Sequence, residues 1–200
     1  MPARELTLAD HLTQGDLVEL TRVEGDAWRL SHVRRLLKLI ELIGQGLAYD
    51  ETAMTIAVCL HDWGGYSRFK EPGVEHALRS RQVAESMILP RMELPGSSAP
   101  VIMEAIEYHD YRDLRPVTST EALLLREADF LDFLGIIGLV REYGRGPADL
   151  VSAYQKILAR REFIRDRFTL PQARELASVR LERLEQCLIW LQEESFDFII

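Results

Sequence analysis

The sequence is poor in cysteine and has no long apolar run. It contains two cysteines, Cys59 and Cys187, and neither belongs to a CxxC pair, which excludes a zinc-knuckle or dithiol redox motif. No stretch approaches the roughly 18 apolar residues of a membrane-spanning helix. The first residues, MPARELTLADHL, include acids and no apolar segment, unlike a secretory signal. We therefore expect a cytoplasmic protein without a membrane partner.

Positive charge is also scarce. The 200 residues carry 24 Lys and Arg against 32 Asp and Glu, a net charge of −8. Because such a chain repels nucleic acid at long range, we expect no nucleic-acid partner. A small anionic ligand remains compatible with this charge, since a bound metal ion inverts the local field. The proportion of hydrophobic residues, 47%, is that of an ordinary globular protein, and the length suits a single domain over residues 1–200.

Apolar residues recur at helical spacing along nearly the whole chain, and no segment shows the alternation typical of a strand. The sequence therefore predicts an all-α fold, a single compact multi-helix bundle. Two helices are expected to begin after the N-caps Asp26 and Asp50, and two more to cover about 74–92 and 100–109. A further helix is expected after a capping box formed by Thr118 and Glu121. Two or three more are expected from Pro147 onward.

Histidine and aspartate occur in a pattern that suits a metal ion. His61 and Asp62 are adjacent near the end of a predicted helix. Neighbours within a helix point about 100° apart, but at its end both can converge on one ion, or the carboxylate can bridge two. Asp129 lies within the apolar segment LLLREADFLDFLG. A carboxylate buried there is costly unless it is paired or bound to metal, so we expect a metal site.

The order of these residues resembles the HD superfamily of metal-dependent phosphohydrolases. It reads Ser31-His32-Val33-Arg34, then Cys59-Leu60-His61-Asp62-Trp63-Gly64, then Arg126-Glu127-Ala128-Asp129. The resemblance covers roughly 26–135, which predicts an HD core at about 26–135 and a C-terminal helical extension at about 136–200. Members that bind two metals add two histidines before the last aspartate, and His76 and His109 occupy those positions here.

The resemblance implies a set of metal ligands and a reaction. His32, His61 and Asp129 would hold one ion and His76 and His109 a second, with Asp62 as the bridge; Asp62 and His61 are the implied catalytic residues. The cofactors would be two divalent transition-metal ions, of iron, manganese, zinc or nickel. The implied reaction is hydrolysis of a nucleotide or related small phosphoester by a metal-activated hydroxide.

The substrate-binding residues are predicted from their place in the sequence. Many of these enzymes carry Lys shortly after the HD pair, where this chain has Gly65. The nearest cations lie in the same loop, and a second loop follows His109. We predict phosphate contacts from these loops, namely from Arg68, Lys70, Arg112 and Arg115.

Two other functions remain open at this stage. Some HD proteins hold a mixed-valent di-iron pair in the same six-ligand arrangement and oxidise a small molecule with dioxygen, and the ligand set alone does not separate the two reactions. A nucleotide-sensing binding module is the third reading, which a protein without bound metal would favour. Either a monomer or a homodimer is compatible with the sequence.

Overall fold

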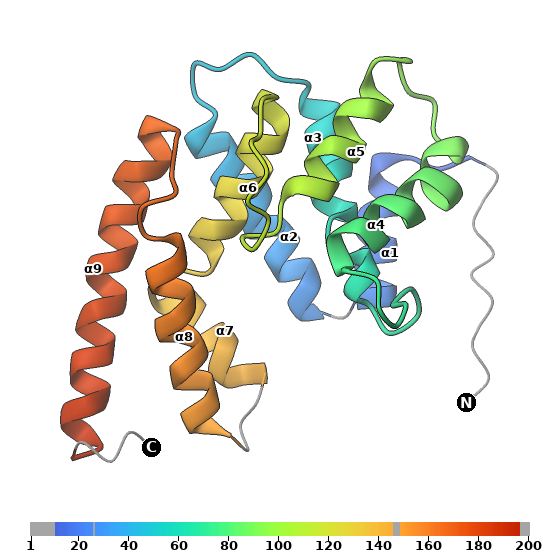
Figure 1. The fold of residues 1–200 in the computed structure, drawn as a ribbon. Helices are drawn as coiled ribbons and strands as arrows, with labels where there is room; N and C mark the ends of the chain where they lie inside the picture. The colour runs from blue at the N-terminus through green and yellow to red at the C-terminus, as the bar shows by residue number, and fades with distance from the viewer. Residues whose placement is uncertain (1–10, 26, 146–148, 197–200) are drawn as a thin grey trace.

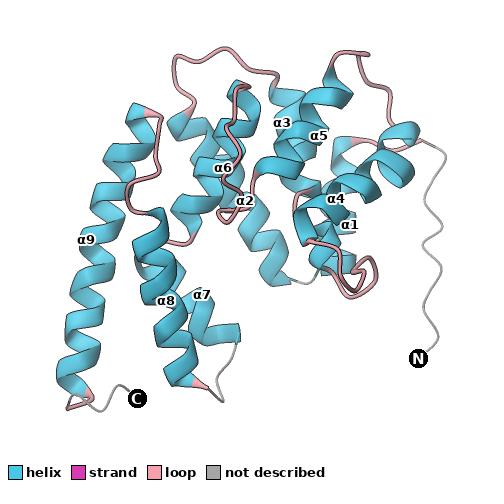
Figure 2. Cartoon of the chain, viewed as in Figure 1, coloured by secondary structure: helices cyan, strands magenta, loops and turns pink. Residues whose placement is uncertain are grey.

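The computed structural model of the chain describes residues 11–25, 27–145 and 149–196. Figure 2 shows that these residues form helices joined by loops, with no strand among them, which confirms the all-α prediction. None of the helices in this described part has the length and apolar character needed to cross a membrane. Asp26 and Pro147, predicted to begin helices, lie outside the described residues.

Nine α-helices follow one another along the described chain. In the first half they are α1 (Gln14–Gly25), α2 (Ala27–Ile43), α3 (Glu51–Leu60), α4 (His76–Val83) and α5 (Ser98–Tyr108). In the second half they are α6 (Thr120–Asp132), α7 (Gly135–Arg145), α8 (Leu150–Ile164) and α9 (Pro171–Glu194).

Helices α2 and α6 pack against each other in the middle of the molecule (Figure 1). Helices α3, α4 and α5 lie on one side of this pair, and α7, α8 and α9 lie on the other. Fully buried leucine and isoleucine side chains such as Leu36, Ile56, Ile102 and Leu124 fill the space between α2, α3, α5 and α6. This apolar core holds the inward-facing polar side chains of the same helices in fixed positions.

The starts of α3 and α6 are joined by carboxylates. Asp50 accepts a hydrogen bond from the backbone N–H of Ala53 at 2.9 Å, which confirms it as the N-cap of α3. The predicted capping box of α6 is wrong, because Ser119 and not Thr118 caps that helix. Glu121 accepts instead from the backbone N–H of Asp50 at 2.9 Å. Sequence spacing missed this bond because its partners lie 71 positions apart.

The helix predicted over about 74–92 is shorter and less regular than expected. Only His76–Val83 is α-helical; a π-helical turn covers Ala84–Ile88 and a 3-10 turn covers Leu89–Arg91. Pro90 accounts for the change, since it lacks an N–H and its ring clashes with the carbonyl four residues earlier in an α-helix.

Helices α7 and α9 pack onto the central pair, and α8 packs onto α7. Gly135, at φ +70°, makes the sharp turn between α6 and α7, a backbone conformation that other residues rarely adopt. Helix α7 contacts α8 and α9, and α9 contacts α2 and α6 as well. Leu184 and Leu188, on the apolar side of α9, are buried. Helices α7 and α9 therefore lie against the helices that carry His32 and Asp129.

Candidate metal centre

The structure brings the six predicted metal ligands together from five helices. They are His32 on α2, His61 and Asp62 directly after α3, His76 at the start of α4, His109 directly after α5, and Asp129 on α6. Four of them sit at helix ends, where the chain turns and two side chains can face the same point. His32 and Asp129 instead point inward from the central pair of helices, and both are buried.

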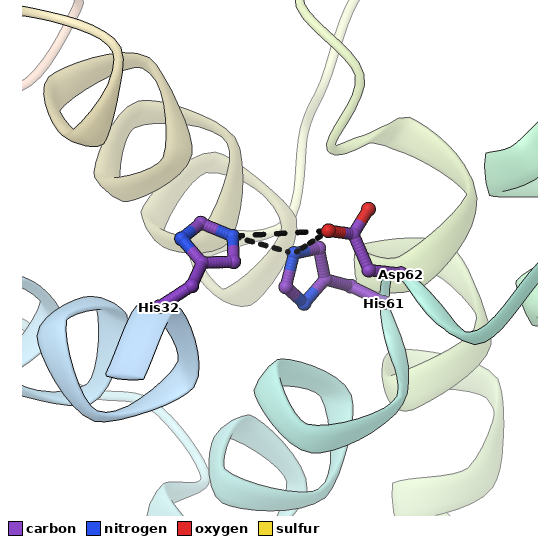
Figure 3. A group of neighbouring side chains, drawn as sticks. All are labelled: His32, His61 and Asp62. Carbon is purple, nitrogen blue, oxygen red and sulfur yellow. Dashed lines mark hydrogen bonds and ion pairs between the residues drawn. The ribbon is translucent and has the colours of Figure 1, made fainter. Parts of the chain in front are cut away.

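A first group of ligand atoms gathers on one oxygen of Asp62 (Figure 3). The Nε2 atoms of His32 and His61 lie 3.2 Å apart, and they are 4.0 and 3.7 Å from Asp62 Oδ2. Asp129 Oδ1 adds a carboxylate 3.4 Å from His32 Nε2. This is the donor set predicted for one ion, two imidazoles and two carboxylates.

A second group gathers on the other oxygen of the same carboxylate. The Nε2 atoms of His76 and His109 also lie 3.2 Å apart, and they are 3.7 and 3.9 Å from Asp62 Oδ1. Asp62 therefore stands between two pairs of imidazoles, with one oxygen toward each pair. This arrangement is the one expected of a carboxylate that bridges two ions.

The hydrogen bonds of the buried histidines determine which ring nitrogen carries the proton. In each ring Nδ1 faces an oxygen that can only accept, so Nδ1 carries the hydrogen and a neutral ring has a bare Nε2. The three bonds are His32 Nδ1 to Asp132 Oδ2 at 2.8 Å, His61 Nδ1 to Val58 O at 2.8 Å and His109 Nδ1 to Ile106 O at 2.6 Å. All three Nε2 lone pairs therefore point into the centre.

This arrangement fits a bound cation and is costly without one. Two bare Nε2 atoms at 3.2 Å direct lone pairs at each other, and no hydrogen bond reaches Asp129 Oδ1 from any described residue. Ligand atoms about 2.1 Å from one ion stand about 3.0–3.4 Å apart in octahedral or tetrahedral geometry. The 3.2 Å between the Nε2 atoms of each histidine pair lies within that range. The described residues thus fit divalent metal ions at both positions.

Charge at the centre is distributed as metal ligands require. Burial lowers the pKa of His61 well below its usual value, so this ring is neutral near pH 7. Burial opposes ionisation of Asp62, but positive charge at the surrounding histidine positions outweighs it and lowers the pKa of that carboxyl well below its usual range. Burial raises the pKa of Asp129, whose Oδ1 accepts no hydrogen bond from the described residues, so a bound cation would favour its ionised form. Neutral imidazoles and carboxylates are the forms that coordinate metal.

Asp132 is a site residue that the sequence analysis missed. Its fully buried side chain accepts from His32 Nδ1, from Arg35 Nε at 2.6 Å and Nη2 at 2.9 Å, and from Arg141 Nη1 at 2.9 Å. It fixes the ring orientation of His32 as carboxylates do for metal-bound imidazoles. A signal was available, because Asp132 follows Asp129 by three residues on an apolar helix and so lies on the same face.

A cavity of about 410 Å³ opens beside the ligands and is rich in arginine. Arg112, predicted as a substrate contact, lines it and is held by Asp110. Three cations that were not predicted line it too, namely Arg29, Arg141 and Arg160. They come from α2, α7 and α8, so only the tertiary structure shows their convergence.

The remaining predicted cations lie elsewhere. Arg68 pairs with Glu24 at 3.2 Å, and Arg115 pairs with Asp113 and Glu107. Neither these two nor Lys70 lines the arginine-rich cavity. Their part in substrate binding stays a prediction, and the structure offers other cations closer to the ligands.

Comparison with known proteins finds similarity in structure. No family model and no curated protein sequence matches the chain. A predicted HD superfamily hydrolase from an uncultured Thermotogales bacterium has a TM-score of 0.64 and 21% identity, over 90% of this chain and 91% of its own. The chain has the HD superfamily fold. An HD-superfamily hydrolase from Bacillus thuringiensis gives 0.64 and 20%, over 90% and 95% of the two chains.

A third similar structure is that of Bacillus subtilis YpgQ in complex with ADP. Its TM-score is 0.71 at 20% identity, and the match covers 94% of this chain and 100% of YpgQ. The resemblance inferred from the sequence is therefore confirmed for the fold. The His and Asp groups described above occupy the centre of this HD fold as candidate metal ligands.

Proposed function

We propose that the protein is a metal-dependent phosphohydrolase that acts on a nucleotide or related small phosphoester. The observation that carries the proposal is the position of Asp62, one oxygen toward His32 and His61 and the other toward His76 and His109. An arginine-rich cavity adjoins it. A hydrolytic centre for phosphoesters needs both parts, ligands for two metal ions and cations for the phosphoryl oxygens.

The arginines favour an anionic substrate. Arg29 Nη1 lies 3.8 Å from Asp62 Oδ2, and its guanidinium stacks 4.4 Å above the ring of Tyr66. Arg141 Nη1 lies 3.9 Å from Asp129 Oδ1. Arginine suits phosphate because its planar guanidinium donates two parallel hydrogen bonds. With Arg112 and Arg160 on the same cavity, these side chains would orient and neutralise a phosphoryl group beside the metal ligands.

The six ligands would hold two divalent ions, and Asp62 would bridge them. Metal bound there supplies Lewis acidity, which lowers the pKa of water and polarises a phosphoryl oxygen. Asp132 and the carbonyl oxygens of Val58 and Ile106 keep the histidine rings turned with Nε2 inward. The catalytic roles proposed for Asp62 and His61 rest on this placement.

Two features of other proteins support the proposal. Solved structures with this fold are described as HD superfamily hydrolases, and YpgQ was crystallised with ADP. A nucleotide carries the phosphate that the arginine-rich cavity suits. The alternative function, a di-iron oxygenase, would use the same six ligands, so the test must separate oxidation from phosphoester hydrolysis.

The test begins with metal analysis of untagged protein purified without chelator, beside the variants Asp62→Ala and Asp62→Asn. We expect two transition-metal ions per chain in the wild type and a loss of metal in both variants. The matched control is Asp113→Ala, which removes a carboxylate that pairs with Arg115 outside the arginine-rich cavity. Circular dichroism establishes that each variant is folded.

The second stage measures reaction. The metal-loaded protein is screened for phosphate release from nucleotides and for oxygen uptake with iron bound. Phosphate release that disappears in Asp62→Ala and persists in Asp113→Ala would support the proposal. Oxygen uptake without phosphate release would replace it with the oxygenase. A folded wild type that binds no metal after reconstitution would contradict both reactions and favour the nucleotide-sensing binding module.

A further inference from the structure

A second and larger cavity adjoins the arginine-rich one. Its volume is about 780 Å³, and it lies between the segment that follows α5 and one face of α8. The two cavities share Tyr111, Arg112 and Arg160 as lining residues. The two cavities are therefore neighbours, divided by these three side chains.

Most of the exposed surface of this second cavity is apolar, although polar and charged side chains also line it. Leu114 lines it from the segment after α5 and is 70% exposed. Helix α8 presents residues at steps of three or four, which places them on one face. They are Ser152, Ala153, Lys156, Ala159, Arg160 and Phe163.

The side chains that separate the two cavities are held in place. The ring of Tyr111 makes edge contacts with Phe133 and Phe163, each with ring centroids 5.6 Å apart. The guanidinium of Arg160 lies 4.2 Å above Phe133 and donates to Glu142 at 2.9 Å. Because these contacts are already made, the junction needs little rearrangement to receive a ligand.

The two cavities suit different chemical groups. The first has the metal ligands and four arginines, and it suits phosphate. In the second, the carboxylate of Glu142 is paired with Arg160, and that of Asp149 accepts from the backbone N–H of Ser152. The acids are thus satisfied within the protein, and Arg112 is paired with Asp110. Lys156 is a further cation of this wall, and most of the remaining exposed surface is apolar. An uncharged planar group fits it better than a phosphate does.

We infer that the second cavity binds the aromatic group, a nucleobase, of a phosphoester whose phosphate lies at the metal centre. The inference rests on the proposed function and specifies its substrate class. Tyr111 and Phe163 supply rings for stacking. Arg160 lines both cavities and so lies between the proposed positions of the base and the phosphate. Nucleoside phosphates are then preferred over inorganic polyphosphate because the inorganic anion leaves this cavity without contacts.

The test compares nucleoside diphosphates with pyrophosphate, which has the charge and no base. Calorimetry at a fixed free Mn²⁺ concentration measures binding of the adenosine, guanosine, cytidine and uridine diphosphates. Stacking of one base is worth a factor of about 10 or more in Kd. We expect the preferred nucleotide to bind at least ~10-fold more tightly than pyrophosphate.

The variant Ala159→Trp fills the second cavity from an exposed position on α8. It should bring the Kd of the preferred nucleotide to that of pyrophosphate and leave pyrophosphate unchanged. The control Gln155→Trp adds the same bulk at an exposed position of α8 that does not line the cavity, and it should change neither Kd. Leu114→Glu, at an exposed position that lines the cavity, is a second variant that preserves the core and should weaken nucleotide alone.

The outcomes separate the two proposals. Equal Kd values for pyrophosphate and all four nucleotides in the wild type would overturn the inference, as would an Ala159→Trp variant that is folded and keeps the nucleotide preference. Binding does not require turnover. A base-dependent Kd in a protein that releases no phosphate from any nucleotide would support the subsite and overturn the proposed hydrolysis.

Discussion

Replacing Asp132 with asparagine should weaken both the fold and the metal centre. Asp132 on α6 accepts hydrogen bonds from His32 and Arg35 on α2 and from Arg141 on α7, and its side chain is fully buried. Asparagine keeps the shape and one acceptor oxygen, but it removes the negative charge and points an NH₂ group at donors. Two guanidinium groups then remain close together without the carboxylate that they share.

The magnitude follows from the burial of the partners. Breaking a buried ion pair by removing one member costs about 3–5 kcal/mol. Arg141 is 3% exposed and meets that description, whereas the Arg35 side chain is 29% exposed, so solvent screens part of its interaction. We therefore expect the lower end, about 3 kcal/mol in the free energy of unfolding. For a chain of this size that corresponds to a fall of about 6–12 °C in Tm.

The same substitution should reduce metal affinity. His32 loses the charged acceptor that turns its Nε2 toward Asp62 and Asp129. Loss of such an orienting partner typically costs about 10–100-fold in metal affinity. The effect should be read as the Kd for Mn²⁺ or Zn²⁺ at a temperature where the variant is folded, beside Tm from circular dichroism without added metal.

A matched control separates burial from charge alone. Glu185→Gln removes a carboxylate that Arg161 binds at 2.9 Å but that is 47% exposed, so the free energy of unfolding should change by less than about 1 kcal/mol. If Asp132→Asn lowers Tm no further than this control, the energetic argument is wrong. A lowered Tm with an unchanged metal Kd would mean that Asp132 joins three helices without orienting His32.

Three further predictions follow from particular contacts. Gly64→Ala should lower Tm, because the added Cβ would lie 2.3 Å from a backbone oxygen of α4. Gly65→Ala should leave Tm unchanged, because a Cβ there would meet nothing closer than 4.0 Å. Asp50→Ala should cost about 1–2 kcal/mol at pH 7 in urea unfolding. Hydrogen bonds to its carboxylate lower the pKa of Asp50, so its contribution is present above pH about 4, and the difference should shrink below that pH. Burial raises the pKa of Cys59 to about 12, so a thiol reagent at pH 8 should label Cys187 and leave Cys59 unmodified.

The ligands of the centre were predictable because their chemistry leaves a local signal. An adjacent His61-Asp62 pair at a helix end and a lone Asp129 in an apolar helix are each unusual, and both point to one explanation. The helix pattern also predicted that these residues lie on different helices. Periodicity shows which face of a helix is buried but not which helix covers it, so it could not show that His32 and Asp132 meet across 100 positions.

The cations near the ligands were not predictable by the same reasoning. Arg68 and Lys70 follow the HD pair closely in sequence, yet the chain between Trp63 and His76 loops away and Arg68 meets Glu24 instead. Closeness in sequence was the only argument for them, and a loop of that length does not preserve it. Arg141 and Arg160 reach the arginine-rich cavity from α7 and α8, beyond the segment that carries the ligand motif.

The metal ligands and the helices that line one side of the cavities come from different parts of the chain. All six candidate ligands come from α2 to α6 or the residues next to them, while one wall of the second cavity and two of the four arginines come from α7 and α8. Gly135 sets the direction in which α7 leaves α6, and Arg141 then returns to Asp132, so the two parts are joined at a buried ion pair. Changes in α7 or α8 that spare Arg141 can therefore alter the substrate group that fits without moving a metal ligand. On the proposed function, variants of α8 such as Ala159→Trp should change which phosphoester is preferred, while metal content stays that of the wild type.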